Sequence, residues 1–409
     1  MRHLIIGASA AGLTAAKTIR SIDRDCEITV VSKDDKVHSR CMLHKYLSGE
    51  RTAEGISFVP EDFFQENRIE WISGAEVQTV NAVGKTAALA DGRTLSFDRL
   101  LIATGAQYVV PPVPGLRGAA NLYGFRDLSD AEAIDRASQP GSRVVIIGSG
   151  LVGMDAAYAL LDRGILPVVV EMAERILPLQ LDDNAASAYQ ERFERAGCSF
   201  RLNAKAASAE VDENANITAI VLDDGERLPC DYVIIAAGVK PAVGFLDGTP
   251  VKPDLLIRVD DHLRTPVEDI YAAGDAAGLS GIWPNAMKQG ITAARNMCGE
   301  DECYTDLYAM KNTINFFGLT ALCIGNINVP GPNADVYIEE DHLNYRKAVV
   351  EDGVLKSILL QGDISGGGIY QYLIKNRIRL PYTGSELFRL SFAEFYGFDE
   401  TSGKYVWQV

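Results

Sequence analysis

A strand that runs through a tight, glycine-closed turn into a helix occurs twice in this chain of 409 residues. In the first copy, the apolar residues 4–6 predict a short buried parallel strand, and a helix begins near Ala10. Gly7 permits the turn and Gly12 lets the helix pack close to the strand, so free N–H groups at the helix N-terminus face a pyrophosphate. Ser9 replaces the usual middle glycine. The predicted phosphate cradle consists of Gly7, Ser9, Ala10, Ala11 and Gly12.

The second copy carries all three glycines of a dinucleotide-binding fingerprint. Residues 143–147 predict its strand, and the turn and helix that follow contain Gly148, Gly150, Leu151, Val152 and Gly153. The next strand, residues 167–170, ends at Glu171, where such folds place the acid that binds a ribose. A carboxylate there accepts hydrogen bonds from both ribose hydroxyls and repels a 2′-phosphate, which favours NADH over NADPH. Arg175 is the nearby residue that would favour NADPH.

In the first half of the chain, the position that corresponds to Glu171 does not carry an acid. Residues 27–31 predict a β-strand, but it ends at Ser32 and Lys33, and the acids Asp34 and Asp35 come only after them. Two interpretations stay open for this pair: binding of a ribose, or a solvated turn.

Both halves end alike, in a buried strand followed by small residues. The first such strand leads to Ala103, Thr104 and Gly105, and the second leads to Gly238. β-rich segments precede both, at residues 69–97 and 217–228. A further strand places Gly274 and Asp275 at its carboxyl end, where open α/β sheets bind ligands, and a helix is predicted over residues 288–298. The fold class predicted is therefore α/β, with two parallel sheets of the dinucleotide-binding type.

Length and composition predict two or three globular domains, because 47% of the residues are hydrophobic and can form several cores. The proline-rich residues 111–115 predict a boundary between two of them. After residue 304, short strands and a helix near residues 370–375 predict a third region. Its many aromatic residues are expected mainly in a core, with a partner-binding face as the alternative.

The net charge of −16 disfavours binding to nucleic acids and to anionic membrane surfaces, since both need clustered lysine and arginine. No leader-like segment and no apolar run of bilayer length is recognised, so we expect a cytoplasmic protein. The seven cysteines are scattered, which is typical of reduced thiols, and no spacing predicts a metal site. Cys298 and Cys303 flank three acidic residues, and we expect them in an ordinary loop.

The order of the motifs resembles the FAD-dependent pyridine nucleotide oxidoreductases with two dinucleotide-binding domains. GASAAG at 7–12, ATG at 103–105, GSGLVG at 148–153, AAG at 236–238 and YAAGD at 271–275 carry the likeness over almost the whole chain. It implies an FAD domain at 1–112 and 240–303, an inserted NAD domain at 113–239 and a C-terminal α+β interface domain at 304–409. RCMLHK at 40–45 and WPNAMKQG at 283–290 are most similar to rubredoxin and ferredoxin reductases and to the flavin part of nitrite reductases.

The resemblance also implies roles for individual residues. FAD is expected at Gly7, Ser9, Ala10, Ala11, Gly12, Ser32, Lys33, Arg40, Ala103, Thr104, Gly105, Gly274, Asp275, Lys288 and Gln289, and NADH at Gly148, Gly150, Leu151, Val152, Gly153, Glu171 and Gly238. Lys45 matches a lysine near flavin N5, where a cation stabilises negative charge on the reduced ring. Asp155 matches its acidic partner, although the family usually has glutamate there.

Cys41 leaves two functions open. Electron-transferring relatives usually have proline at this position, whereas single-cysteine reductases and NADH oxidases carry a redox cysteine near it. Arg40 and Lys45 are expected to lower the pKa of this thiol. The leading prediction is an NADH oxidoreductase that passes electrons through FAD to an iron–sulfur protein or a partner redox subunit. The alternative is a reductase of disulfides, persulfides or peroxides, or an NADH oxidase, that uses Cys41. A homodimer is left open.

Overall fold

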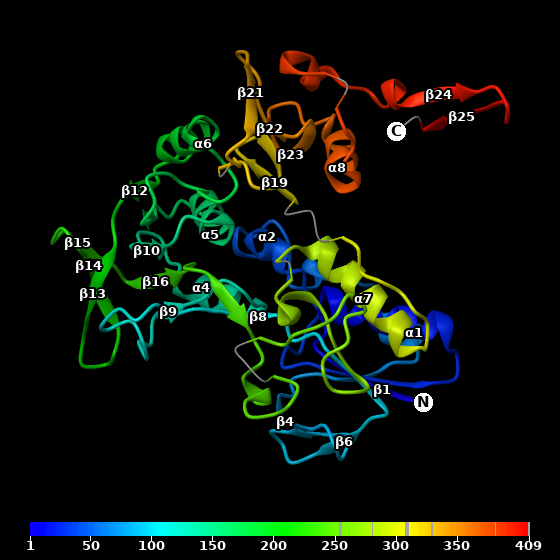
Figure 1. Ribbon diagram of the computed structural model, residues 1–409. Coiled ribbons are helices and arrows are strands. Elements are labelled where there is room, and N and C mark those ends of the chain that lie inside the picture. The colour runs from blue at the N-terminus through cyan, green and yellow to red at the C-terminus, as the bar shows by residue number, and fades with distance from the viewer. Residues whose placement is uncertain (253–255, 280, 307–310, 329, 381, 408–409) are drawn as a thin grey trace. The chain divides into compact units, whose positions relative to one another are not determined.

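The computed structural model describes residues 1–252, 256–279, 281–306, 311–328, 330–380 and 382–407 (Figure 1). The chain forms two compact units. One comprises Met1–Met172 and Gly197–Leu307, and the other comprises Ala173–Ala196 and Tyr308–Val409.

The N-terminal strand lies in the middle of a five-stranded, all-parallel sheet of the first unit. The sheet has the order β18-β7-β1-β2-β3. Its strands are β1 (Arg2–Ile6), β2 (Glu27–Val31), β3 (Glu70–Ile72), β7 (Arg99–Ile102) and β18 (Ile270–Ala272). Ile5 on β1 packs under the helices α1 (Ala10–Ile22) and α7 (Trp283–Met297), while Leu4 and Ile6 face the other way. That second face is covered by a small antiparallel sheet of β4 (Val77–Asn81), β5 (Thr86–Leu89) and β6 (Thr94–Ser96).

A second parallel sheet of the same unit repeats this plan, with the order β12-β11-β10-β16-β9. It is built from β9 (Leu122–Tyr123), β10 (Val144–Ile147), β11 (Val168–Val170), β12 (Ser199–Arg201) and β16 (Tyr232–Ile235), with helices α4 (Leu128–Ala137) and α5 (Leu151–Asp162). One face packs on the antiparallel strands β13 (Ala206–Val211), β14 (Ile217–Leu222) and β15 (Arg227–Pro229). The antiparallel pair β8 (Ala106–Tyr108) and β17 (Val239–Pro241) and the short helices α2 (Leu43–Leu47) and α3 (Phe63–Glu66) complete the unit.

The second unit is built on an antiparallel sheet with the order β19-β20-β23-β22-β21. Its elements are α6 (Asp183–Arg195), β19 (Lys311–Phe316), β20 (Leu319–Ile324), β21 (Ala334–Glu340), β22 (Tyr345–Glu351), β23 (Val354–Gln361), α8 (Gly367–Asn376), β24 (Tyr396–Asp399) and β25 (Lys404–Trp407). Phe388 and Phe395 join the core that α8 forms with the sheet, whereas Phe398 and Tyr405 on the β24–β25 hairpin are exposed. The aromatic residues of this region are thus divided between core and surface.

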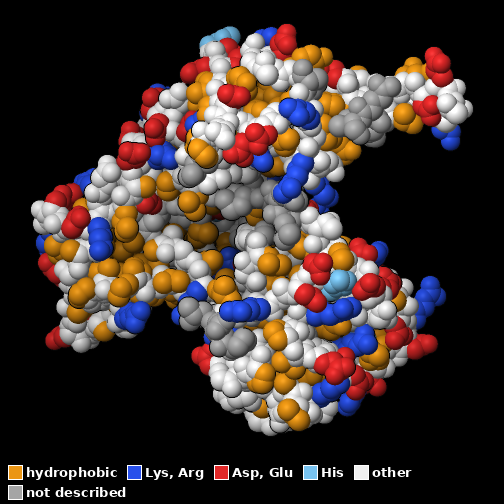
Figure 2. All heavy atoms as spheres, in the orientation of Figure 1, with side chains coloured by type: hydrophobic (Ala, Val, Ile, Leu, Met, Phe, Trp, Pro, Cys, Tyr) orange, Lys and Arg blue, Asp and Glu red, His pale blue; other side chains and the backbone are white. Residues whose placement is uncertain are grey.

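The α/β fold class with two parallel sheets is confirmed. Helix α7 begins earlier than the predicted residue 288, because Pro284 lies in its first turn, where a missing backbone N–H costs no hydrogen bond. Among the described residues, no helix is both long enough and apolar enough to cross a membrane. Acidic and basic side chains are interspersed over the described residues of the face in Figure 2. The three-domain division stays a prediction.

Candidate functional site

The first glycine turn closes so tightly that only glycine fits at its two ends. Gly7 has a φ of +116°, and a Cβ on it would lie 2.2 Å from the carbonyl oxygen of Ala103. A Cβ on Gly12 would lie 1.9 Å from the carbonyl oxygen of Gly7. Ser9 is the N-cap residue of α1, so the N–H groups of the first helical turn point out of the cradle. This is the anion-binding geometry that the sequence predicts.

A cavity of about 260 Å³ adjoins this cradle. Of the residues predicted to bind FAD, it is lined by Gly7, Ser9, Ser32, Lys33, Arg40, Ala103 and Thr104. A neighbouring recess is lined by Ser9, Ala10, Ala11, Arg40, Ala103, Gly105, Gly274 and Asp275, together with Cys41. The hydroxyl of Thr104 is buried without a hydrogen-bond partner among the described residues. A helix N-terminus, an adjoining cavity lined by both polar and apolar residues, and an unpaired hydroxyl fit a dinucleotide such as FAD.

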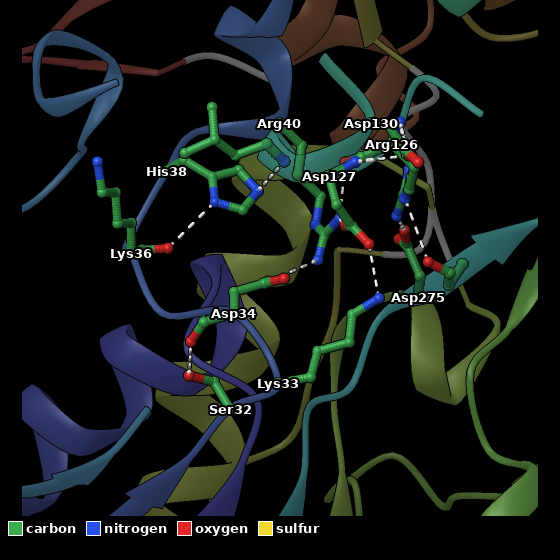
Figure 3. Close-up of polar contacts among 12 residues, drawn as sticks. Ser32, Lys33, Asp34, Lys36, His38, Arg40, Arg126, Asp127, Asp130 and Asp275 are labelled. Atoms are coloured by element: carbon green, nitrogen blue, oxygen red, sulfur yellow. Dashed lines mark hydrogen bonds and ion pairs between the residues drawn. The ribbon is translucent and has the colours of Figure 1, made fainter. Parts of the chain in front are cut away.

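A network of charged side chains joins the cavity to the recess (Figure 3). The Arg40 guanidinium pairs with Asp127, donates to the backbone carbonyl of Arg126 at 2.7 Å and lies 3.7 Å from Asp34. Lys33 Nζ lies 2.6 Å from Asp127 Oδ2, and Arg126 pairs with Asp275. Burial and the neighbouring Arg126 lower the pKa of Arg40 to about 10, which leaves it charged at neutral pH. Three cations, Lys33, Arg40 and Arg126, therefore line the cavity or the recess, where they can attract phosphates.

Sequence reasoning missed Arg126 and Asp127. Asp127 is the N-cap residue of α4, and Asp130 accepts hydrogen bonds from the backbone N–H groups of Arg126 at 2.8 Å and Asp127 at 3.1 Å. The signal in the sequence was this capping box, two acids three residues apart at the start of an amphipathic helix.

The other residues predicted to bind FAD differ in burial and in their contacts. Gln289 is buried, and its side-chain carbonyl accepts the backbone N–H of Gly274 at 2.7 Å, which fixes the turn that carries Asp275. Ser32 is also buried, but its hydroxyl donates to the Asp34 carbonyl and accepts from the Trp71 indole. Lys288 is exposed and pairs with Asp306, and it lines neither the cavity nor the recess.

The second cradle has the same backbone geometry. Gly148 has a φ of +106°, and a Cβ on Gly153 would lie 2.0 Å from the Gly148 carbonyl oxygen. The Glu171 carboxylate accepts both the backbone N–H and the hydroxyl of Ser149, at 2.8 and 2.9 Å. Leu151 and Val152 form the first turn of α5, and Gly238 follows β16. Arg175 is paired with Glu174 and Asp183 in the second unit.

Lys45 and Asp155 come from α2 and α5, which pack against each other. In the described part of the chain, Lys45 and Asp155 form no ion pair with each other: Lys45 pairs with Glu50, and the Asp155 carboxylate lies 3.9 Å from His44 Nδ1. The Asp155 side chain keeps 31% of its area exposed, yet its place deep among protein atoms raises its pKa to about 7. The positive charge of Lys45 opposes that rise. Burial and Lys45 lower the pKa of His44 to about 4, so this imidazole is neutral at physiological pH.

The expectation that cations lower the pKa of Cys41 is wrong. Its side chain is exposed within the recess, but the surrounding protein, followed by the charge of Asp155, raises the pKa of the thiol. Arg126 and Arg40 oppose this effect without reversing it. Cys41 is therefore a thiol rather than a thiolate at neutral pH.

Comparisons with known proteins agree with this geometry. The chain is 32% identical over 392 residues to the NADH-dependent phenylglyoxylate dehydrogenase subunit epsilon of Aromatoleum evansii, covering 93% of this chain and 92% of the relative. It is 30% identical to an NADH oxidase of Methanocaldococcus jannaschii, covering 73% of this chain and 70% of the relative. It is 27% identical to the nitrite reductase [NAD(P)H] of Bacillus subtilis, covering 89% of this chain but only 46% of that longer protein.

Among solved structures, the ferredoxin reductase for the CYP199A2 system of Rhodopseudomonas palustris superposes with a TM-score of 0.83. It is 24% identical, with 93% of this chain and 95% of that one covered, and thus shows the shared fold. Two glycine cradles on two parallel sheets are the geometry of a protein that binds two dinucleotides. The chain belongs to the pyridine nucleotide-disulphide oxidoreductase family, whose sequence profile matches residues 1–290. It is an FAD-dependent NAD(P)H oxidoreductase.

Proposed function

We propose that this enzyme oxidises NADH and passes the electrons to an iron–sulfur protein or to a partner redox subunit. FAD, when bound, supplies the chemistry that joins a two-electron donor to a one-electron acceptor. The observation that carries the proposal is the similarity of the chain, over nearly its whole length, to a dehydrogenase subunit, which supports a partner subunit as the acceptor. The burial that raises the pKa of the Cys41 thiol is consistent with it, since a protonated thiol is a poor nucleophile.

The two cradles take different nucleotides in this proposal. The first cradle, the Arg40 and Arg126 network and the Asp275 turn hold FAD, with phosphates at the N-terminus of α1. The second cradle holds NADH, and Glu171 accepts hydrogen bonds from its ribose. Because Arg175 is already paired with two carboxylates, it is not available to attract a 2′-phosphate, and this supports NADH over NADPH.

The chain's own catalytic contribution is assigned to Lys45 and Asp155. Lys45 supplies a fixed positive charge that favours negative charge on the reduced ring. Asp155, with a pKa near neutrality, adjusts the local charge and takes up or releases a proton at its carboxylate. Neither role requires Cys41.

A second function is favoured by one observation. The Cys41 side chain is accessible from the recess that Asp275 and Trp283 also line, so a small disulfide, persulfide or peroxide could reach its sulfur. The similarity to an NADH oxidase supports the same alternative.

An anaerobic screen of acceptors with NADH tests the proposal. Rubredoxin-type and ferredoxin-type proteins and one-electron dyes are compared with disulfides, persulfides and peroxides, for the native enzyme and for Cys41→Ser. We expect turnover with protein or dye acceptors that Cys41→Ser preserves. Turnover confined to small sulfur or peroxide substrates, and abolished in Cys41→Ser, would favour the alternative.

A further inference from the structure

Cys303, His262, Asp261 and Asp301 meet beyond the C-terminal end of α7. Cys303 Sγ lies 3.5 Å from His262 Nε2 and 3.7 Å from Asp261 Oδ2. Asp301 Oδ1 lies 3.0 Å from the same imidazole nitrogen. In a tetrahedral zinc site, Zn–S bonds of about 2.3 Å and Zn–N or Zn–O bonds of about 2.0 Å set neighbouring ligand atoms roughly 3.3–3.6 Å apart. The distances from His262 Nε2 to Cys303 Sγ and to Asp301 Oδ1 are close to those values.

Buried hydrogen bonds hold the two segments of the cluster together. The side-chain amide of Asn296, which is 2% exposed, donates to the backbone carbonyls of His262 at 2.9 Å and Glu302 at 2.8 Å. It also accepts the backbone N–H of Glu302 at 2.9 Å. The backbone N–H of Tyr304 donates to the Asp261 carbonyl at 2.7 Å. The backbone on either side of the potential ligands is therefore fixed without a metal.

The imidazole is oriented as a metal ligand. Asp261 Oδ1 lies 2.8 Å from His262 Nδ1, so a carboxylate can hold the proton on that nitrogen and leave the lone pair of Nε2 facing Cys303. The His262 side chain is only 18% exposed, whereas that of Asp301 is 85% exposed and leaves a route for an ion to enter. A thiolate and an imidazole select zinc over magnesium or calcium.

We propose that Cys303, His262 and Asp301 bind a divalent cation of the zinc class, and that Asp261 is the outer-sphere partner that orients the imidazole. The candidate site shares no residue with the cavity or the recess of the redox site. Binding displaces the thiol proton of Cys303 to solvent, so that the sulfur coordinates as a thiolate. The competing interpretation is an imidazole hydrogen-bonded between two aspartates without a metal.

Cobalt(II) alone is the probe, because tetrahedral cobalt with a thiolate ligand absorbs red light that oxidised flavin does not absorb. FAD-loaded enzyme is freed of metals with a chelator and titrated with cobalt, and zinc is then added to displace it. We expect one equivalent of tetrahedral cobalt, bleached by zinc, and a rise in Tm with bound metal. Cys303→Ser and His262→Gln should each weaken binding by more than the ten- to roughly hundredfold typical of lost outer-sphere partners.

Glu300→Gln is the matched control, since Glu300 lies on the same loop but faces Arg295, 3.8 Å away. It removes the same charge as Asp261→Asn, and we expect it to leave cobalt binding unchanged while Asp261→Asn weakens it. Flavin absorbance and Tm establish that each variant is folded. The proposal is overturned if native enzyme gives no tetrahedral cobalt spectrum, if the spectrum survives in Cys303→Ser, or if Glu300→Gln loses binding as fully as Asp261→Asn.

Discussion

The two glycine cradles share a backbone and differ in their polar groups. Gly7 and Gly148 both take positive φ, and Gly12 and Gly153 both bring a helix within van der Waals range of the first glycine's carbonyl. The middle position differs: Ser9 stands in the first cradle, and a Cβ on Gly150 in the second would meet nothing within 4 Å. Glycine is thus required where backbone meets backbone, and the middle position tolerates a side chain.

The two cradles differ more at the carboxyl ends of the neighbouring strands, β2 in the first and β11 in the second. In the second cradle the Glu171 carboxylate folds back onto Ser149 in the glycine turn. In the first, Ser32 bonds to the Asp34 carbonyl and Lys33 to Asp127, and the cation Arg40 also pairs with Asp127. An acid at one strand end and cations near the other are consistent with two nucleotides bound by different contacts.

Gly12→Ala should have the largest effect. Its Cβ would lie 1.9 Å from a backbone oxygen that cannot move aside, so the cost reaches or exceeds the upper end of the roughly 1–3 kcal/mol usual for overpacking. We expect purified enzyme without flavin and with a lower Tm. Ser9→Gly is the control in the same turn and should keep its FAD. Full flavin content in Gly12→Ala would show that the close approach is not required.

Lys45→Ala tests the contribution of α2, the short helix that packs against α4 and α5. Removing one preorganised charge at a catalytic centre typically costs about 2.7–4 kcal/mol, so flavin reduction by NADH should slow roughly a hundredfold and the flavin potential should fall. Stopped-flow absorbance and a redox titration measure both. Lys36→Ala, which removes an exposed lysine paired with Glu54, serves as control. A native rate and potential in Lys45→Ala would remove Lys45 from the mechanism.

Glu171→Gln should change the second cradle alone. The amide keeps an acceptor for Ser149 but loses the charge that binds ribose hydroxyls, and a hydrogen bond to a charged group contributes about 1.5–3 kcal/mol. We expect kcat/KM for NADH to fall about tenfold, with NADPH unaffected or improved and FAD content unchanged. Glu174→Gln, an exposed neighbour, should change neither nucleotide. If the preference for NADH over NADPH is unchanged in Glu171→Gln, another residue determines this preference.

Asp155→Asn should have a smaller, pH-dependent effect. The folded pKa of Asp155 is raised to about 7 from a model-peptide value near 3.8, so the native state binds more protons than the unfolded state between those values. This carboxyl therefore contributes stability below about pH 4 that is lost as the pH rises to about 7. Tm measured across this range should fall less steeply with pH in Asp155→Asn. Parallel profiles for the two proteins would contradict the raised pKa.

The cradles were predictable from sequence because each depends on glycines a few residues apart, and backbone sterics leave few alternatives at those positions. The Arg40 and Asp127 pair was not, since 87 residues separate them and only the packing of α4 brings them together. The same applies to His262 and Cys303, whose 41-residue separation matches no metal-binding spacing. The predicted direction of the Cys41 pKa was wrong for a related reason. The sequence shows the cations near Cys41, but it does not show that the thiol is surrounded by protein or that Asp155 lies near it.

The central claim is that electrons pass from NADH through FAD without the thiol of Cys41, and an anaerobic NADH titration of the oxidised enzyme tests it most directly. A redox-active cysteine that is oxidised at rest consumes a second electron pair. We predict that one equivalent of NADH fully reduces each FAD, in the native enzyme and in Cys41→Ser alike. A requirement for two equivalents in the native enzyme, falling to one in Cys41→Ser, would contradict the account and establish the thiol-based reductase.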